Sequence, residues 1–382
     1  MKLNVLFGLV FFSIHALGVN VDNPLPVPYV VSNYPILNAV EKNGGTLSTS
    51  TKKWMKKWNG MNLEDENLYR LDELSGTTSI NLKIHKIDLE DPNGVKSLGS
   101  FVTNNEAANP PAEIAYFNLS AILGVDKMFR PTIPYVLGEK GSLQFRNLLE
   151  TTTIKGSIRN ENKEHILSKI NQNGFLLGCV KAKKNDTTDE VEDMVKSGGF
   201  FSRGGVRMNH PVLKMLDAKS AMPTDATTIE IRRGYNGKSL TLAREFSILL
   251  TLDSVFGQYD RFSGGNIVVE KDENEMAHFV ATDNGGADVV DSVPATKATL
   301  KLFSRYDRQV ILKLKELNNF LNDPSKSYLG YTDVNQFLLD LGLYYRYPLD
   351  RYLKGLKENL NLLLRQVHEQ EEKYGDKIYF PN

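Results

Sequence analysis

Apolar and polar positions alternate over residues 79–87, where Ile80 and Leu82 are separated by a polar side chain. A period of two places alternate side chains on opposite faces of a β-strand. The following residues include Asp-Pro-Asn-Gly at positions 91–94, a strong turn sequence, and strand character returns over residues 95–102. The pattern therefore predicts a β-hairpin.

A helix and a further strand are predicted after this hairpin. Pro110 opens the helix, Glu113 lies in its first turn, and apolar residues follow near helical spacing until Gly124. Residues 129–137 then have the composition of a strand. Residues 75–140 are therefore predicted to form a small β-rich layer that contains one helix.

The C-terminal half begins with a predicted helix, in which apolar residues recur at helical spacing from residue 241 until Gly257. Two short strands, at residues 267–269 and 278–281, enclose a polar turn. Residues 297–377 are helical in pattern. The chain therefore predicts an α+β fold, with a β-rich N-terminal part and a mainly helical C-terminal part.

Two stretches lack a regular pattern. Residues 19–70 begin with many Pro, Asn and Ser residues, which predicts an extended leader with little structure of its own. Residues 160–235 combine a polar run, an acidic stretch and glycine pairs, which predicts a long insertion with exposed loops. No repeat of fixed period appears along the sequence.

The N-terminus has the pattern of a secretory signal peptide. Lys2 precedes an apolar stretch over residues 3–14, and residues 16–18 read Ala-Leu-Gly, which places small residues where a signal peptidase cleaves. We therefore expect cleavage of residues 1–18 and a secreted product. No later apolar run approaches the roughly 18 residues needed to span a bilayer, so no transmembrane segment is expected.

Composition narrows the functional classes. The chain has 382 residues, of which 41% are hydrophobic, enough for the core of one large domain or two smaller ones. Lys and Arg total 46 and Asp and Glu total 46, so no net charge attracts polyanions and we do not expect a nucleic-acid-binding protein. Cys179 is the only cysteine, which excludes an intrachain disulfide.

Oxygen-bearing side chains flank the two short strands of the C-terminal half. Asn266 precedes the first strand and Asp283 follows the second, and the midpoint between them falls in the polar turn. If the strands pair as a hairpin, these side chains lie close together at its open end, with Asp260 one loop earlier. Carboxylate and amide oxygens suit Mg²⁺ or Mn²⁺, and a further aspartate can orient or deprotonate a hydroxyl. Phosphoryl transfer requires this arrangement.

The pair Asp260-Arg261, with Asn266 and the Asp-Asn-Gly triplet at residues 283–285, resembles the catalytic and metal-binding loops of the kinase superfamily. The likeness is to its atypical branch, which includes phosphatidylinositol 3/4-kinases and secretory-pathway kinases of the four-jointed type. The resemblance implies a two-lobed protein-kinase-like fold, with ATP as the phosphoryl donor. It implies that Asp260 is the catalytic aspartate and that Asn266 and Asp283 hold Mg²⁺ or Mn²⁺. Arg261 would then be structural or face a phosphate.

The N-terminal half extends the resemblance. Residues 112–117 are similar to the helix, and residues 130–134 to the following strand, of the N-terminal lobe in these kinases. The resemblance implies that Glu113 pairs with the lysine that binds the nucleotide. It also implies an N-lobe over residues 71–150 and a C-lobe over residues 151–382, the latter carrying the insertion described above.

One departure from the family pattern concerns spacing. Asn266 follows Asp260 by six positions, one more than is usual in these families. The pair Gly264-Gly265 must therefore accommodate an extra residue, which glycine's wide range of backbone angles permits. The assignment of Asn266 as a metal ligand depends on this loop.

A second departure concerns the nucleotide lysine. The strand segment that should carry it, residues 99–105, contains no lysine. Lys96 is the predicted substitute for nucleotide binding, with Lys83 and Lys86 as alternatives. The turn that contains Gly76 precedes the first strand and is predicted to cover the nucleotide.

These observations predict a secreted atypical kinase that transfers the γ-phosphoryl group of ATP to a hydroxyl of a protein, lipid or glycan, with Mg²⁺ or Mn²⁺ as cofactor. The missing strand lysine favours an alternative, a secreted pseudokinase that binds a nucleotide or a partner without catalysis. A third interpretation is a non-kinase binding domain whose loop only mimics the kinase motif. The sequence leaves these alternatives open.

Overall fold

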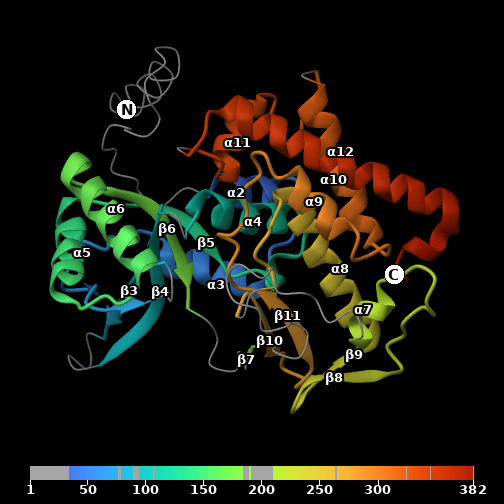
Figure 1. The fold of residues 1–382 in the computed structure, drawn as a ribbon, viewed down its shortest axis with the longest axis horizontal. Coiled ribbons are helices and arrows are strands. Elements are labelled where there is room, and N and C mark those ends of the chain that lie inside the picture. Colours follow the sequence, from blue (N-terminus) through green and yellow to red (C-terminus); the bar gives the residue numbers. More distant parts are fainter. Residues whose placement is uncertain are drawn as a thin grey trace.

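The computed structural model describes residues 34–75, 79–88, 94–105, 108–183, 189–190, 210–262, 265–323, 325–344 and 346–381. The predicted signal peptide and Gly76 lie outside these ranges. Within them, a sheet-rich N-terminal region lies beside a helical C-terminal region (Figure 1). The predicted α+β fold class is confirmed, and no described helix has the length and apolar character to cross a membrane.

The N-terminal sheet is antiparallel. Its strand order is β1 (Tyr69–Arg70), β3 (Asn81–Ile87), β4 (Val95–Thr103), β6 (Leu176–Ala182) and β5 (Thr132–Leu137), and β2 (Leu74–Ser75) also pairs with β3. The pairing of β3 with β4 confirms the predicted hairpin, with an irregularity between Ile84 and His85. The turn residues 91–93 lie outside the described residues.

Strand β6 was not foreseen from the sequence. It lies between β4 and β5, so the predicted insertion at residues 160–235 contains a central strand and the sheet extends beyond residue 150. Its sequence, LLGCVKA, does not alternate because both faces are covered. Val180 packs into one core cluster and Cys179 into another.

Two helices, α5 (Glu139–Thr151) and α6 (Ser157–Asn173), cover one face of this sheet (Figure 1). Phe145 and Leu149 of α5 and Ile166 and Ile170 of α6 join the buried cluster on that face. The polar run at residues 160–165, in the first half of α6, is mainly solvent-facing except for the buried Asn162. Only one stripe of a surface helix reaches the core.

The predicted extended leader is wrong over residues 35–58, which form two packed helices. These are α2 (Pro35–Lys42) and α3 (Thr49–Trp58). Ser48 caps α3 by accepting a hydrogen bond from the Thr51 backbone, and Trp58 is fully buried. The Pro and Ser residues of this segment therefore mark helix starts rather than an absence of structure.

Helix α4 (Pro110–Leu123) is the centre of the molecule (Figure 1). It starts and ends as predicted, with Gly124 in a left-handed conformation at φ 78°. All of its 14 residues are buried, because it contacts β5, β6, α2, α8 (Ser239–Phe256), α10 (Arg308–Asn322) and α11 (Val334–Leu341). The sequence pattern predicted one buried apolar face, whereas every side of the helix is buried.

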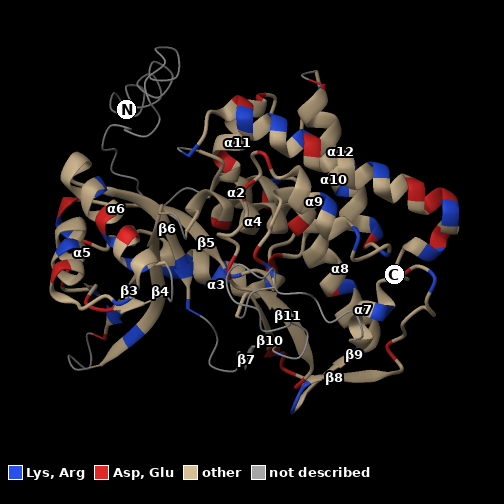
Figure 2. Cartoon of the chain, viewed as in Figure 1, with Lys and Arg blue, Asp and Glu red and all other residues tan. Residues whose placement is uncertain are grey.

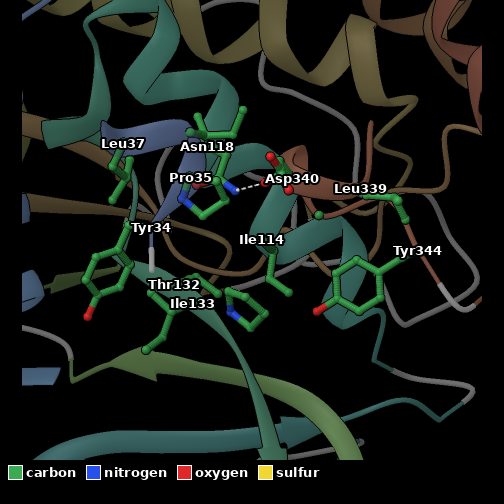
Figure 3. Close-up of a pocket in the computed structure, with 13 residues that line it drawn as sticks. Tyr34, Pro35, Leu37, Ile114, Asn118, Thr132, Ile133, Leu339, Asp340 and Tyr344 are labelled. Atoms are coloured by element: carbon green, nitrogen blue, oxygen red, sulfur yellow. Dashed lines mark hydrogen bonds between the residues drawn. The ribbon is translucent and has the colours of Figure 1, made fainter. Parts of the chain in front are cut away.

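A small cavity of about 40 Å³ lies between α2, α4, β5 and α11 (Val334–Leu341). Tyr34, Ile114 and Tyr344 line it, and the side-chain nitrogen of Asn118 donates to the carbonyl of Asp340 at 3.2 Å (Figure 3). The same nitrogen donates to the carbonyl of Leu341 at 3.0 Å. These hydrogen bonds attach α4 to the helical region.

The helical region confirms the pattern predicted for the C-terminal half. Its main helices are α8 (Ser239–Phe256), α9 (Val293–Leu300), α10 (Arg308–Asn322), α11 and α12 (Leu349–Tyr374). Smaller elements are α7 (Pro211–Met215), a two-stranded sheet of β8 (Thr228–Arg232) and β9 (Tyr235–Lys238), and a three-stranded sheet of β7 (Asp189–Glu190), β10 (Ile267–Lys271) and β11 (Ala277–Ala281). Acidic and basic side chains intermingle along α12, in keeping with the balanced charge of the chain (Figure 2).

Candidate functional site

The hairpin of β10 and β11 confirms the pairing predicted for the C-terminal half. Ile267 lies opposite Ala281, and the next backbone hydrogen bond runs from Thr282 N to Asn266 O at 3.2 Å. Asn266 and Asp283 therefore leave the same end of the hairpin, offset by one residue. Asp283 is exposed to solvent there.

Asp260 lies against this hairpin end. The side-chain nitrogen of Asn266 donates to the backbone oxygen of Asp260 at 2.6 Å and to its carboxylate at 3.4 Å. From the other side, a Cβ atom on Gly286 would lie only 2.6 Å from the Cβ of Asp260. The structure thus brings Asp260 and Asn266 together with the loop that follows Asp283.

Gly265 shapes the segment between Asp260 and Asn266. Its φ of 83° is in the left-handed region that favours glycine. Its carbonyl accepts a hydrogen bond of 2.6 Å from the hydroxyl of Thr282, which connects the loop to the residue that follows β11. Gly264, the other half of the glycine pair, lies outside the described residues.

Arg261 occupies the centre of the loop network and is only 1% exposed. Its guanidinium forms an ion pair with Asp253 of α8, whose side chain is also 1% exposed. It further donates to the backbone oxygens of Asn266 and Asp283 at 3.0 and 3.2 Å, and to Oδ1 of Asn284 at 2.7 Å. Of the two roles expected for Arg261, these contacts support the structural one.

Glu113 pairs with Lys181 of β6. The Lys181 ammonium and a Glu113 carboxylate oxygen form an ion pair, and their side chains are 9% and 3% exposed. Lys96, the predicted partner, lies at the opposite end of β4, where its side chain is 76% exposed and pairs with Asp88 at 2.6 Å. The partner of Glu113 therefore lies on β6, a strand that the sequence pattern did not predict.

The position of Lys181 explains the apparent absence of a strand lysine. Ser100 of β4, within the segment expected to carry the lysine, lies directly opposite Lys181 in the adjacent strand. A lysine on β6 thus reaches Glu113 from one strand further across the sheet. The available signal was a single charged residue inside the apolar run LLGCVKA, since lysines are seldom buried without a partner.

The ionisable groups of the site influence one another. Burial raises the pKa of Glu113, and the charge of Asp283 raises it further, whereas Lys181 opposes both. Loss of surrounding water also acts to raise the pKa of Asp283, but the charge of Lys181 and a hydrogen bond from the Gly285 backbone outweigh this effect and lower that pKa. Asp283 is therefore ionised at neutral pH and available to a cation.

The donor set fits a divalent metal that arrives with a phosphate ligand. Among the described residues, no group of three or more His, Cys, Asp and Glu side chains is arranged to hold a metal. Asp283 and Asn266 do provide hard oxygen donors, and the second carboxylate oxygen of Glu113 is buried without a hydrogen-bond partner. Mg²⁺ commonly binds through one or two carboxylates plus substrate phosphates, which matches this small set.

His278 makes a second charged cluster on β11, away from the loops described above. Its Nδ1 lies 2.6 Å from Oε1 of Glu245 on α8, and its Nε2 lies 3.2 Å from Asp272. The hydrogen bond to Glu245 raises the pKa of His278, and the charge of Glu245 and the hydrogen bond to Asp272 raise it further. Burial and the charge of Lys127 act in the opposite direction but are smaller in sum. The protonated imidazole therefore joins α8 to the hairpin.

This cluster predicts a pH-dependent stability. A histidine with a raised folded pKa stabilises the fold fully below its unfolded pKa, near 6.5, and the stabilisation is lost as the pH rises through the folded pKa. We expect the melting temperature to fall as the pH rises from the unfolded to the folded pKa of His278. His278→Gln should remove this pH dependence and lower the free energy of unfolding at low pH by about 1.5–3 kcal/mol. His368→Gln, on the exposed surface of α12, is the control, and equal pH profiles for both variants would contradict the prediction.

Comparison with known proteins identifies similar folds only among solved structures, because no family model and no curated protein sequence matches the chain. A crystal structure of the Golgi casein kinase has a TM-score of 0.51 and 14% identity, over 93% of this chain and 94% of that chain. A crystal structure of the Golgi casein kinase with Mn/ADP bound has a TM-score of 0.50 and 13% identity, over 98% of this chain and 92% of that chain. A hydra Fam20 protein with sugar has a TM-score of 0.51 and 13% identity, over 84% and 90%.

At these identities the likeness establishes the fold. The two-lobed, kinase-like architecture predicted from the sequence is confirmed by the match over nearly the whole chain. Two of these structures are described as the Golgi casein kinase, which agrees with the secretory-pathway part of the resemblance. The likeness to phosphatidylinositol kinases remains a prediction.

Proposed function

We propose that this protein is an atypical kinase of the secretory pathway that transfers the γ-phosphoryl group of ATP to a hydroxyl, with Mn²⁺ or Mg²⁺ as cofactor. The observation that carries the proposal is the buried Lys181–Glu113 pair beside Asp283. These side chains come from β6, α4 and the loop after β11. Phosphoryl transfer depends mainly on positioning and charge neutralisation, which such a cluster supplies.

Each residue of the site has a role in this proposal. Lys181 binds the nucleotide phosphates, and Glu113 holds the lysine in place. Asp283 and Asn266 would hold the metal, which neutralises phosphate charge when bound. Asp260, beside Asn266, orients the acceptor hydroxyl and accepts its proton.

Lys181 also bears on the pseudokinase alternative. That alternative relied on the absence of a lysine from residues 99–105, and a lysine on the neighbouring strand removes the reason for it. A neighbour described as the Golgi casein kinase with Mn/ADP bound supports a metal–nucleotide complex as the ligand. The Golgi origin of that kinase also agrees with the signal peptide predicted at residues 1–18.

The test is metal-dependent nucleotide binding followed by turnover. We expect the secreted protein to bind ADP in calorimetry only when Mn²⁺ or Mg²⁺ is present, and to transfer phosphate from radiolabelled ATP to itself or to an added acceptor hydroxyl. Absence of metal-dependent nucleotide binding would overturn the proposal. Binding without transfer to protein, lipid or glycan acceptors would instead establish the pseudokinase alternative.

A further inference from the structure

We propose that Tyr116 and Asp253 are positioning residues that set the distance between the two proposed metal ligands, Asn266 and Asp283. The inference rests on the proposed function, because it concerns the metal–nucleotide site. Neither residue faces that site directly. Both act through the guanidinium of Arg261.

The Arg261 guanidinium spans the two metal-ligand positions. A single nitrogen, Nη1, donates to the backbone oxygens of Asn266 and Asp283 at 3.0 and 3.2 Å. Nη2 donates to Asn284, the residue after Asp283, at 2.7 Å. The separation of the two ligand backbones therefore depends on where this one rigid group lies.

Asp253 fixes the orientation of that group. Its two carboxylate oxygens accept from Nε of Arg261 at 3.2 and 3.1 Å, and its Oδ1 also accepts from Nη2 at 3.0 Å. A guanidinium has five N–H donors, and these contacts together with those to the two loops use all five. A rotation of the Arg261 side chain would leave buried donors without partners.

Tyr116 joins this ion pair to helix α4. Its hydroxyl donates to Oδ1 of Asp253 at 2.9 Å, and its ring lies 5.7 Å from the Arg261 guanidinium. Tyr116 is fully buried and follows Glu113 by three positions, so both project from the same side of α4. One helix thus holds the proposed phosphate-binding lysine through Glu113 and the metal-ligand loops through Tyr116.

The energetics of a buried ion pair favour a positioning role. Taking both charges out of water offsets most of their attraction, so such a pair adds little stability compared with apolar side chains of the same size. Its contribution is a fixed geometry, since every donor must be satisfied. In this chain the fixed geometry is that of the loops which carry Asn266 and Asp283.

The experiment compares Tyr116→Phe with Tyr306→Phe. Tyr306 is also fully buried, and its hydroxyl accepts from Gln366 at 3.0 Å in the helical region, so its variant also loses one buried hydroxyl and a hydrogen bond to it. The Mn²⁺ concentration that gives half-maximal ADP binding is measured by calorimetry below the melting temperature of every variant. We expect about a tenfold increase for Tyr116→Phe, as for other residues that orient metal ligands, and no change for Tyr306→Phe.

Asp253→Asn provides a second test, because it keeps the side-chain shape and removes the charge. We expect at least the increase seen with Tyr116→Phe. Suppose that the wild-type protein binds Mn²⁺ with ADP, but that Tyr116→Phe and Asp253→Asn need no more Mn²⁺ than Tyr306→Phe does. The positioning role is then overturned, and the proposed function stands. If the wild-type protein does not bind Mn²⁺ with ADP, both fail.

Discussion

Lys181→Met is expected to reduce kcat/KM for phosphoryl transfer by about 10²–10³-fold, the range for loss of one preorganised donor to developing charge. Methionine keeps the apolar stem but removes the ammonium group that pairs with Glu113. The charge of Lys181 also lowers the pKa of Asp283, so its loss weakens the ionised state of that carboxylate. The measurement is steady-state transfer from ATP, with ADP affinity determined in parallel.

Stability must be separated from function in this variant. Removing one partner of a buried ion pair leaves the other charge uncompensated, at a cost of about 3–5 kcal/mol. The double variant Lys181→Met/Glu113→Gln removes both charges, and we expect it to recover much of the melting temperature without recovering turnover. Recovery of turnover in the double variant would show that Lys181 acts only on stability.

Lys96→Met tests the assignment made from the sequence. Lys96 is exposed and pairs with Asp88, so we expect wild-type turnover and ADP affinity from this variant. An inactive Lys96→Met together with an active Lys181→Met would show instead that the lysine that binds the nucleotide is Lys96 on β4.

The identity of the lysine could not be predicted because strand pairing is not local. Alternation and turn residues are enough to predict the β3–β4 and β10–β11 hairpins, whose strands are close in sequence. The ion pair of Glu113 with Lys181 joins residues 68 positions apart, and nothing in either segment specifies the neighbour. The sequence predicted the kind of residue needed, while the order of strands decided which lysine supplies it.

Arg261 illustrates the same limit at shorter range. The Asp-Arg pair identified the loop, but its sequence was compatible with an arginine that faces a phosphate. The observed side chain turns inward to Asp253, eight positions earlier on α8. The distinguishing feature was an aspartate inside the apolar helix α8, which needs a buried partner.

Asp283→Asn and Asp260→Asn are expected to separate binding from chemistry. Asp283→Asn should abolish metal-dependent ADP binding together with turnover, because it removes the ionised carboxylate of the donor set. Asp260→Asn should keep metal-dependent ADP binding and lose about 10²–10⁴-fold in kcat, the contribution typical of a positioned general base. Calorimetry with ADP and Mn²⁺ and turnover with ATP measure the two quantities independently.

The contrast is informative because the two residues share their surroundings. Asp260 contacts Asn266 and would touch any side chain placed at Gly286, three positions after Asp283. A general disturbance of the hairpin end would therefore impair both variants alike. If Asp260→Asn loses ADP binding to the same extent as Asp283→Asn, Asp260 belongs to the metal site and the catalytic base must be sought elsewhere. If Asp260→Asn keeps both binding and turnover, its carboxylate has no part in the chemistry and only its backbone contact with Asn266 matters to the site.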